Sequence, residues 1–145
     1  MRKFFKVNGY NGDTDMPIRK TKYSAGYDIV APETVFIQPH TFVIVPTNIK
    51  VAVEDNEFVM IVPRSSLYKK HHLIMVNSVG VIDADYYNNP DNDGNVGALL
   101  LNDSDVVQVI GKNEAFAQAI ITEYKVTDDD NASGKRIGGF GSTDK

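Results

Sequence analysis

Short apolar runs constrain the fold of this chain more than any other feature of its sequence. They are rich in Val and Ile, and Pro, Gly, Asn and Asp separate them, which is the pattern of strands joined by turns. The runs are residues 35–37, 42–45, 58–62, 73–76, 96–101 and 115–121. No segment keeps a 3.6-residue apolar period for three turns, and the best helical candidate, residues 65–72, would span one or two turns. The sequence predicts an all-β barrel or double-sheet fold with at most one short helix.

Several of these runs are apolar at consecutive positions rather than at alternate ones, as in FVMIV at residues 58–62. Strands of this kind bury both of their faces. An oligomer whose sheets pack against neighbouring chains would explain the pattern, and so would a well-filled jelly roll. The runs alone leave these two alternatives open.

Length and composition are those of a soluble single-domain protein. The 145 residues suffice for one hydrophobic core, and no apolar stretch approaches the roughly 20 residues that span a bilayer. The N-terminus lacks the apolar segment of a signal peptide. The absence of Cys excludes thiolate and disulfide chemistry, and a net charge of −4 argues against a broad nucleic-acid-binding surface. We expect a cytoplasmic protein that binds neither membranes nor nucleic acid.

The last part of the sequence differs from the rest. From Thr127 onward the chain is polar and glycine-rich, with almost nothing to bury, so this part is expected to be mobile in isolation. Residues 1–126 are therefore predicted to form the folded domain and residues 127–145 a mobile arm. The arm nevertheless carries cations, an aromatic residue and hydroxyls, an unusual set for a dispensable tail.

Two segments are candidate binding sites. In residues 24–28, small residues precede Asp28 at the start of a strand, and a turn capped by Asp28 is the favoured interpretation of this segment alone. In residues 63–67, Arg64 and two serines follow a strand and precede the candidate helix. A forked guanidinium beside outward-pointing amides makes a phosphate cradle. A surface arginine beside an N-capping serine would explain these residues equally well.

Residues 77–86 hold the densest group of special residues. Gly80 predicts a tight hairpin between two apolar arms, and Asp83 and Asp85, two residues apart, would share one face of a strand. Paired acids can bind a metal or supply a general base. The alternative is a solvated strand edge with Tyr86 as a half-buried core residue.

The glycines at 138, 139 and 141 let backbone amides turn toward an anion, and Ser142 and Thr143 add donors. This is not a Walker loop, because Phe140 stands where Lys belongs and no helix can follow. Residues 89–94 begin like an EF-hand, but Leu100 stands at the bidentate Glu position, so a hairpin loop is expected. His71 and His72 lack metal-site spacing and are expected at the surface.

Taken in order, these segments resemble the five motifs of the trimeric dUTPase family. The matches are AGYDIVA at 25–31, PRSSL at 63–67, GVIDADY at 80–86, a weaker AQAI at 117–120, and RIGGFGST at 136–143. The resemblance implies a jelly-roll-like barrel with a flexible C-terminal arm. It also implies a homotrimer whose sites take motifs from three subunits, and hydrolysis of dUTP to dUMP and pyrophosphate with Mg²⁺ as cofactor.

The resemblance also implies a role for each site residue. Asp83 would be the general base for the water that attacks the α-phosphorus, Gln118 a further catalytic residue, and Asp28 a contact to Mg²⁺ through water. Asn77 and the hairpin backbone would recognise uracil, Tyr86 would lie under the deoxyribose, and Phe140 would stack over the base. The implied substrate-binding residues are Arg64, Ser65, Ser66, Asn77, Gly80, Val81, Ile82, Tyr86, Arg136, Phe140, Gly141, Ser142 and Thr143.

The sequence departs from the family pattern at several places. Ser66 stands where Gly is common, and residues 87–89 replace the usual Arg-Gly pair in a loop that looks longer than typical. Two other functions are compatible with parts of this sequence. A dCTP deaminase would need a Glu at the base pocket, for which only Glu114 and Glu123 are near candidates. A regulator that uses the arm to control a protein partner could coexist with catalysis.

Overall fold

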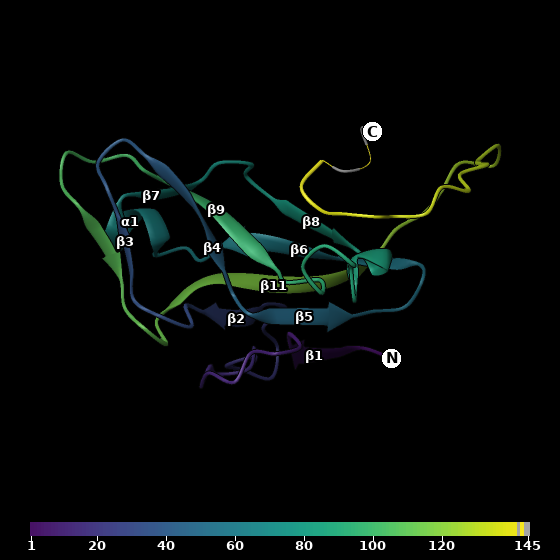
Figure 1. The fold of residues 1–145 in the computed structure, drawn as a ribbon, viewed down its shortest axis with the longest axis horizontal. Helices are drawn as coiled ribbons and strands as arrows, with labels where there is room; N and C mark the ends of the chain where they lie inside the picture. The colour runs from purple at the N-terminus through teal and green to yellow at the C-terminus, as the bar shows by residue number, and fades with distance from the viewer. Residues whose placement is uncertain (142, 144–145) are drawn as a thin grey trace.

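The computed structural model describes residues 1–141 and 143, and most of its regular structure is short antiparallel strands (Figure 1). The all-β prediction is therefore confirmed, and each of the six apolar runs lies largely within a strand. The strands are β1 (Lys3–Lys6), β2 (Tyr27–Val30), β3 (Val35–Ile37), β4 (Phe42–Pro46), β5 (Ile49–Ala52), β6 (Glu57–Pro63), β7 (Leu73–Met75), β8 (Gly80–Asp83), β9 (Gly97–Asn102), β10 (Gln108–Ile110) and β11 (Ala115–Glu123).

Helical structure is confined to two short pieces among the described residues. Helix α1 (Leu67–His71) lies inside the predicted segment 65–72, and a single 3₁₀ turn, η1 (Ala84–Tyr86), follows β8. Positively charged side chains in the last turn of α1 suit the negative end of the helix. None of the helices in the described part of the chain is long and apolar enough to cross a membrane.

The strands pair into four antiparallel sheets rather than into one continuous closed barrel. The largest sheet has the order β2-β11-β6-β8, and a three-stranded sheet has the order β4-β9-β7. The pairs β1-β5 and β10-β3 complete the fold. Strand β8 is an edge strand of its sheet, so one side of its backbone has no strand partner among the described residues.

The hydrophobic core lies between the two larger sheets and joins side chains from both. Along β6 and β9 buried and less buried residues alternate, because successive side chains of a strand point to opposite faces. Val59 and Ile61 of β6 and Leu100 of β9 are almost completely buried in this core. The core therefore fixes the faces that β6 and its neighbour β8 present to solvent.

One sheet face remains apolar and exposed in the single chain. Phe42 and Ile74 both lie opposite Leu101 in the register of β4-β9-β7, and Ile44 lies opposite Leu99. The exposed fractions of Phe42, Ile44, Ile74 and Val76 are 64%, 51%, 39% and 47%. We call these four residues the outer apolar face. An exposed apolar patch of this kind marks an interaction surface.

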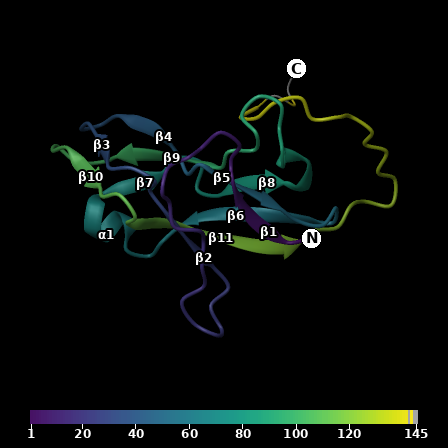
Figure 2. The same ribbon diagram turned by 60° about the horizontal axis from the view of Figure 1, so that its bottom comes forward.

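The arm runs back over the molecule after β11. Figures 1 and 2 show the yellow chain swinging away from the end of β11 and returning toward β8 and the loop beyond it. The described part of the arm has no helix or strand of its own. Its contacts with the rest of the chain include the ion pairs of Arg136 and the packing of Gly139 against Tyr86.

Candidate active site

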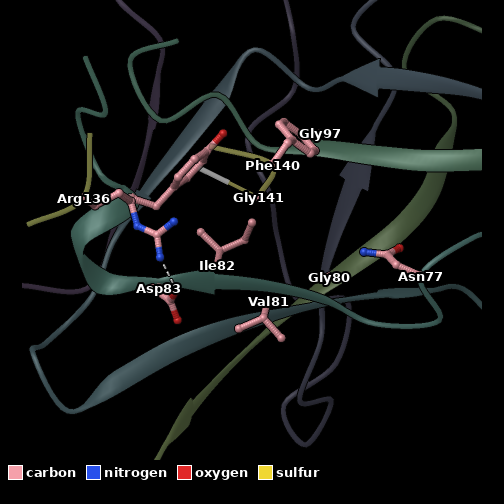
Figure 3. A pocket seen from close by; sticks show the side chains of 10 residues that line it. Asn77, Gly80, Val81, Ile82, Asp83, Gly97, Arg136, Phe140 and Gly141 are labelled. Atoms are coloured by element: carbon pink, nitrogen blue, oxygen red, sulfur yellow. Dashed lines mark hydrogen bonds and ion pairs between the residues drawn. The ribbon is translucent and has the colours of Figure 1, made fainter. Parts of the chain in front are cut away.

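A pocket opens where β8, the loop before it, the start of β9 and the arm meet (Figure 3). It encloses about 220 Å³. The lining residues are Asn77, Gly80, Val81, Ile82, Asp83, Tyr86, Gly97, Arg136, Phe140 and Gly141. All but Gly97 are among the site residues expected from the sequence, so the structure brings the third and fifth motifs together within one chain.

The turn that precedes β8 differs from the predicted hairpin. Strands β7 and β8 belong to different sheets, and the chain reverses at Asn77 and Ser78 rather than at Gly80. Ser78 takes the left-handed conformation with φ of 61°. Gly80 instead begins β8, where a Cβ atom would lie 3.2 Å from the Cβ of Ile61. Glycine at this position therefore favours close packing of β8 on β6 and is not part of the turn.

Two acids flank the end of β8 and share one cation. Asp83 ends the strand and Asp85 lies in η1. Arg136 of the arm pairs with both, through Nη2 to Asp83 and through Nε to Asp85 at 2.7 Å. The Arg136 side chain is only 15% exposed, whereas the two acids are 50% and 59% exposed. The acids do face the same side, as expected, although the turn rather than a continuous strand places them there.

Tyr86 is buried, with 6% of its surface exposed, and not half-buried as the alternative interpretation of this segment required. Its hydroxyl donates to the carbonyl of Asn95 at 3.1 Å and accepts from the amide of Asn92 at 2.7 Å. Gly139 packs against its ring, where an added Cβ would lie 2.9 Å from Cε2. Only glycine lets the arm approach the ring this closely. Phe140, in contrast, is 66% exposed at the rim.

A second group of predicted residues lies together at the other end of the same sheet. Asp28 of β2 and Gln118 of β11 are register partners, and Arg64 Nε is 3.4 Å from Asp28 Oδ1. Gln118 Nε2 donates to the carbonyl of Pro63 at 3.3 Å. Gly26 leaves room for Gln118, since a Cβ there would lie 2.1 Å from Oε1. The first, second and fourth motifs therefore form one cluster.

The serines of the second motif are both exposed. Ser65 lines a shallow groove beside Arg64, and Ser66 occupies the N-cap position of α1 without making a side-chain capping bond. Thr143 is exposed at the end of the described arm. Ser142 lies outside the described residues.

Strand register separates the Arg64 cluster from Asp83. Asp83 lies opposite Phe58 and Gly80 lies opposite Ile61, three residues before Arg64. At about 3.3 Å per residue, Asp83 and Arg64 of one chain are therefore about 20 Å apart along the sheet. In Figure 3, Asn77 and Asp83 lie toward opposite ends of the pocket. A nucleotide whose base lies near Asn77 and whose α-phosphate lies near Asp83 thus directs its phosphates away from Arg64 of the same chain.

The Asp28 carboxylate is the best candidate for a metal contact. Its Oδ2 atom is buried and has no hydrogen-bond partner among the described residues, although the side chain is 13% exposed. Such an oxygen suits a Mg²⁺-bound water, because Mg²⁺ keeps several of its waters in protein sites. Within residues 1–141 and 143, no group of three or more His, Cys, Asp or Glu side chains could hold an ion alone. The donor set fits a metal carried mainly by phosphate oxygens.

His71 is not a surface residue as expected, because it is ion-paired with Glu114. Its side chain is 13% exposed, while His72 is exposed as predicted. Burial raises the pKa of Glu114, but contacts from His71, the Gly111 N–H and Lys70 together outweigh burial and hold this pKa below its usual value. Arg64 Nη1 donates to the carbonyl of Ala115 at 3.4 Å. The contact between His71 and Glu114 therefore connects α1 to the chain next to Ala115, whose carbonyl binds Arg64.

Known proteins resemble this chain over most of its length. The dUTPase family model matches residues 13–144. The chain belongs to the dUTPase family. A deoxyuridine 5'-triphosphate nucleotidohydrolase of Lactococcus lactis is 42% identical over 99% of this chain and 97% of its own length. A relative of the same name from Nautilia profundicola is 33% identical over 97% of this chain and 98% of its own.

Solved structures share the fold of this dUTPase family member. The dUTPase of Streptococcus mutans superimposes with a TM-score of 0.84 at 35% identity, over 88% of this chain and 99% of its own. The dUTPase of Staphylococcus bacteriophage 80alpha, 24% identical, has the same fold with a TM-score of 0.73 over 98% of this chain and 97% of its own.

Proposed function

We propose that this chain hydrolyses dUTP to dUMP and pyrophosphate by attack of water on the α-phosphorus. One arrangement supports this most directly. Asp83, the expected base, lies in the same pocket as Asn77, the β8 backbone and Tyr86. A carboxylate at the end of a nucleoside-sized pocket is where a base for an attacking water must lie.

The edge position of β8 suits recognition of uracil. In the part of the chain that the structure describes, the backbone N–H and C=O groups on the free side of residues 80–82 have no strand partner, so they can pair with the uracil edge. Asn77 adds a side-chain amide at the end of the pocket. Cytosine would place an amino group where uracil has an acceptor, and unmatched buried polar groups discriminate strongly between substrates.

The arm supplies the cation that controls the base. While Arg136 pairs with Asp83 and Asp85, the base carboxylate is occupied. A triphosphate attracts the guanidinium at least as strongly, because phosphate accepts bidentate charge-assisted hydrogen bonds. Transfer of Arg136 from Asp83 to the phosphates frees the carboxylate to accept a proton from water. Closure of Phe140 over the base then excludes bulk water.

The second cluster of residues is assigned to the triphosphate and its metal. Bound Mg²⁺ would neutralise phosphate charge and orient the pyrophosphate leaving group. Asp28 would accept a hydrogen bond from a metal-bound water through Oδ2. Arg64, Ser65 and Gln118 would donate to phosphate oxygens.

We further propose that the enzyme is a homotrimer whose sites combine residues of different subunits. The direction of the nucleotide along β8 carries its phosphates away from Arg64 of the same chain, so another chain must provide the Arg64 cluster. The outer apolar face supports assembly, because Phe42 and Ile44 are more than half exposed in the single chain. The arm, in contrast, reaches the pocket of its own chain in this structure.

Deaminase chemistry has less support. Glu114 is paired with His71 and Lys70, and Glu123 ends β11. Neither lines the pocket at β8.

Incubation with dUTP, dCTP, dTTP or UTP in the presence of Mg²⁺ tests the reaction. We expect pyrophosphate from dUTP only, and ammonia from dCTP would contradict the proposal. Asp83→Asn should lower kcat by at least about 100-fold, the usual worth of a general base, while binding of an α,β-imido dUTP analogue persists. Asp85→Asn is the matched control: it alters the other carboxylate that pairs with Arg136 and should keep kcat within a few-fold. Equal losses of kcat in the two variants would contradict the assignment of Asp83, and not Asp85, as the general base.

A further inference from the structure

Tyr86, which closes one side of the pocket, takes its position from the segment 87–95. Its hydroxyl is held by Asn92 and by the carbonyl of Asn95. Its ring also packs against Gly139 of the arm. The position of the Tyr86 ring therefore depends on the conformation of residues 87–95, which hold its hydroxyl.

The segment 87–95 has a backbone that needs support from elsewhere. Asn88 and Asp93 have φ of 57° and 58°, and Gly94 has φ of 78°. Non-glycine residues in the left-handed region cost energy unless the surrounding structure holds them there. The turn is also tight, since a Cβ on Gly94 would lie 2.6 Å from the carbonyl oxygen of Tyr86. No strand of the described fold includes this segment.

Lys50 of β5 provides that support. The residue is only 4% exposed. Its Nζ donates to Asn88 Oδ1 at 2.5 Å and to the two Asp93 oxygens at 3.0 and 2.8 Å. The ammonium also lies 5.1 Å from the centre of the Tyr87 ring. One buried cation thus binds both left-handed non-glycine residues of the segment.

Asp93 is held from a second direction. Its carboxylate accepts the Asn8 backbone N–H at 2.6 Å and the Asn8 side-chain amide at 3.1 Å. Burial raises the pKa of Asp93, but these bonds and the Lys50 ammonium outweigh burial and hold the pKa below its usual value. The Asp93 carboxylate that Lys50 contacts is therefore ionised at neutral pH. Removing one partner of a buried pair leaves the other uncompensated.

We propose that Lys50 is a positioning residue that sets the sugar specificity of this site. By holding Asn88 and Asp93 in place, it keeps Tyr86 against the space that a ribose 2′-hydroxyl would need. The inference rests on the proposed hydrolysis of dUTP, in which Tyr86 lies under the deoxyribose. Lys50 is not among the residues that line the pocket, so it acts on specificity through the segment 87–95 alone.

Lys50→Met tests this directly, because it keeps the length of the side chain and removes the ammonium. We expect the ratio of kcat/KM for dUTP to that for UTP to fall at least about tenfold, the scale on which one small group is discriminated. Amides of residues 87–95 should exchange with deuterium faster than in the wild type. Asp93→Asn, which leaves Lys50 with amide oxygens as partners, should shift both readouts in the same direction by less. It also provides the test if Lys50→Met does not fold.

Asn102→Ala is the matched control for a general loss of stability. Asn102 is completely buried and its amide holds the carbonyls of Ile37 and Val106. It lies at the opposite end of β9 from Gly97. We expect a lower melting temperature and an unchanged sugar ratio.

Two results would overturn the inference: an unchanged ratio in both Lys50→Met and Asp93→Asn, or an equal fall in Asn102→Ala. A wild-type protein that does not hydrolyse dUTP would instead remove the proposed function. In that case, amide exchange of residues 87–95 in Lys50→Met would still show whether Lys50 holds this segment in place. Exchange rates equal to those of the wild type would contradict this role of Lys50 as well.

Discussion

Mixing two inactive variants tests whether one active site takes residues from two chains. Asp83→Asn removes the expected base, and Arg64→Ala removes the expected phosphate donor. In one chain these residues are separated by about 20 Å, from the strand rise per residue, and the proposed nucleotide points away from Arg64. Each variant alone should therefore be inactive for a different reason. Their mixture should recover activity only if different chains contribute the two residues.

The expected recovery follows from random assortment. In oligomers formed from equal amounts of the two variants, half of the sites carry a native Asp83. Half of these receive a native Arg64 from the neighbouring chain, so about a quarter of wild-type activity returns in a symmetric homo-oligomer. If both residues acted within one chain, no site would be intact and no activity would return.

The assay is co-refolding from urea in equal amounts, with native mass spectrometry to confirm mixed oligomers and pyrophosphate release as the readout. A chain that carries both substitutions, mixed with wild type, is the matched control. It should give about a quarter of full activity if sites are shared between chains, and about a half if they are not. Zero recovery in the first mixture with half activity in the second would refute the shared site.

Two further predictions follow from individual contacts. Gly139→Ala places a Cβ 2.9 Å from the Tyr86 ring, and such overpacking costs about 1–3 kcal/mol. The KM for dUTP should rise roughly tenfold or more with an unchanged melting temperature; an unchanged KM would mean that the arm does not seat on Tyr86. The N–H of Glu54 and the pair with Arg2 lower the pKa of Glu57 below its ordinary 4.5. This stabilisation is present above the pKa of Glu57 in the unfolded chain and is lost as the pH falls through the lower pKa of the folded state. At pH values below about 4.5, the urea midpoint of the wild type should therefore decrease with falling pH more steeply than that of Glu57→Gln. Parallel curves for the two proteins would contradict this prediction.

Strands were predictable from the sequence where they are continuously apolar. The runs that became β6, β9 and β11 are rich in Val, Ile, Leu and Ala, and they form the centres of the two larger sheets. Strand β5 was not anticipated, because Lys50 interrupts Ile49 and Val51 with a charge. That charge is buried because Asn88 and Asp93 lie beside it in the fold. The local sequence around Lys50 does not reveal the Asp93 partner, because Asp93 lies 43 residues further along the chain.

The site was predictable in its residues more than in its geometry. Motif resemblance named nine of the ten residues that line the pocket. It placed the turn at Gly80, however, whereas Asn77 and Ser78 make it, because a serine can also take the left-handed conformation. The burial of His71 depends on Glu114, a partner 43 residues away. The contact of Arg136 with Asp83 and Asp85 was not predictable, because the arm has no apolar residues at a spacing that would determine where it packs.

The outer apolar face has a consequence for the life of the protein in a cell. In the homotrimer proposed above, a newly synthesised chain would expose Phe42 and Ile44 until it assembled with further copies of itself. Its folded lifetime would then depend on its own abundance, because association stabilises by mass action. At low expression, lone chains would be substrates for chaperones and proteases. Loss of the enzyme on dilution would therefore be abrupt rather than proportional, as assembly, stability and active-site completion disappear together.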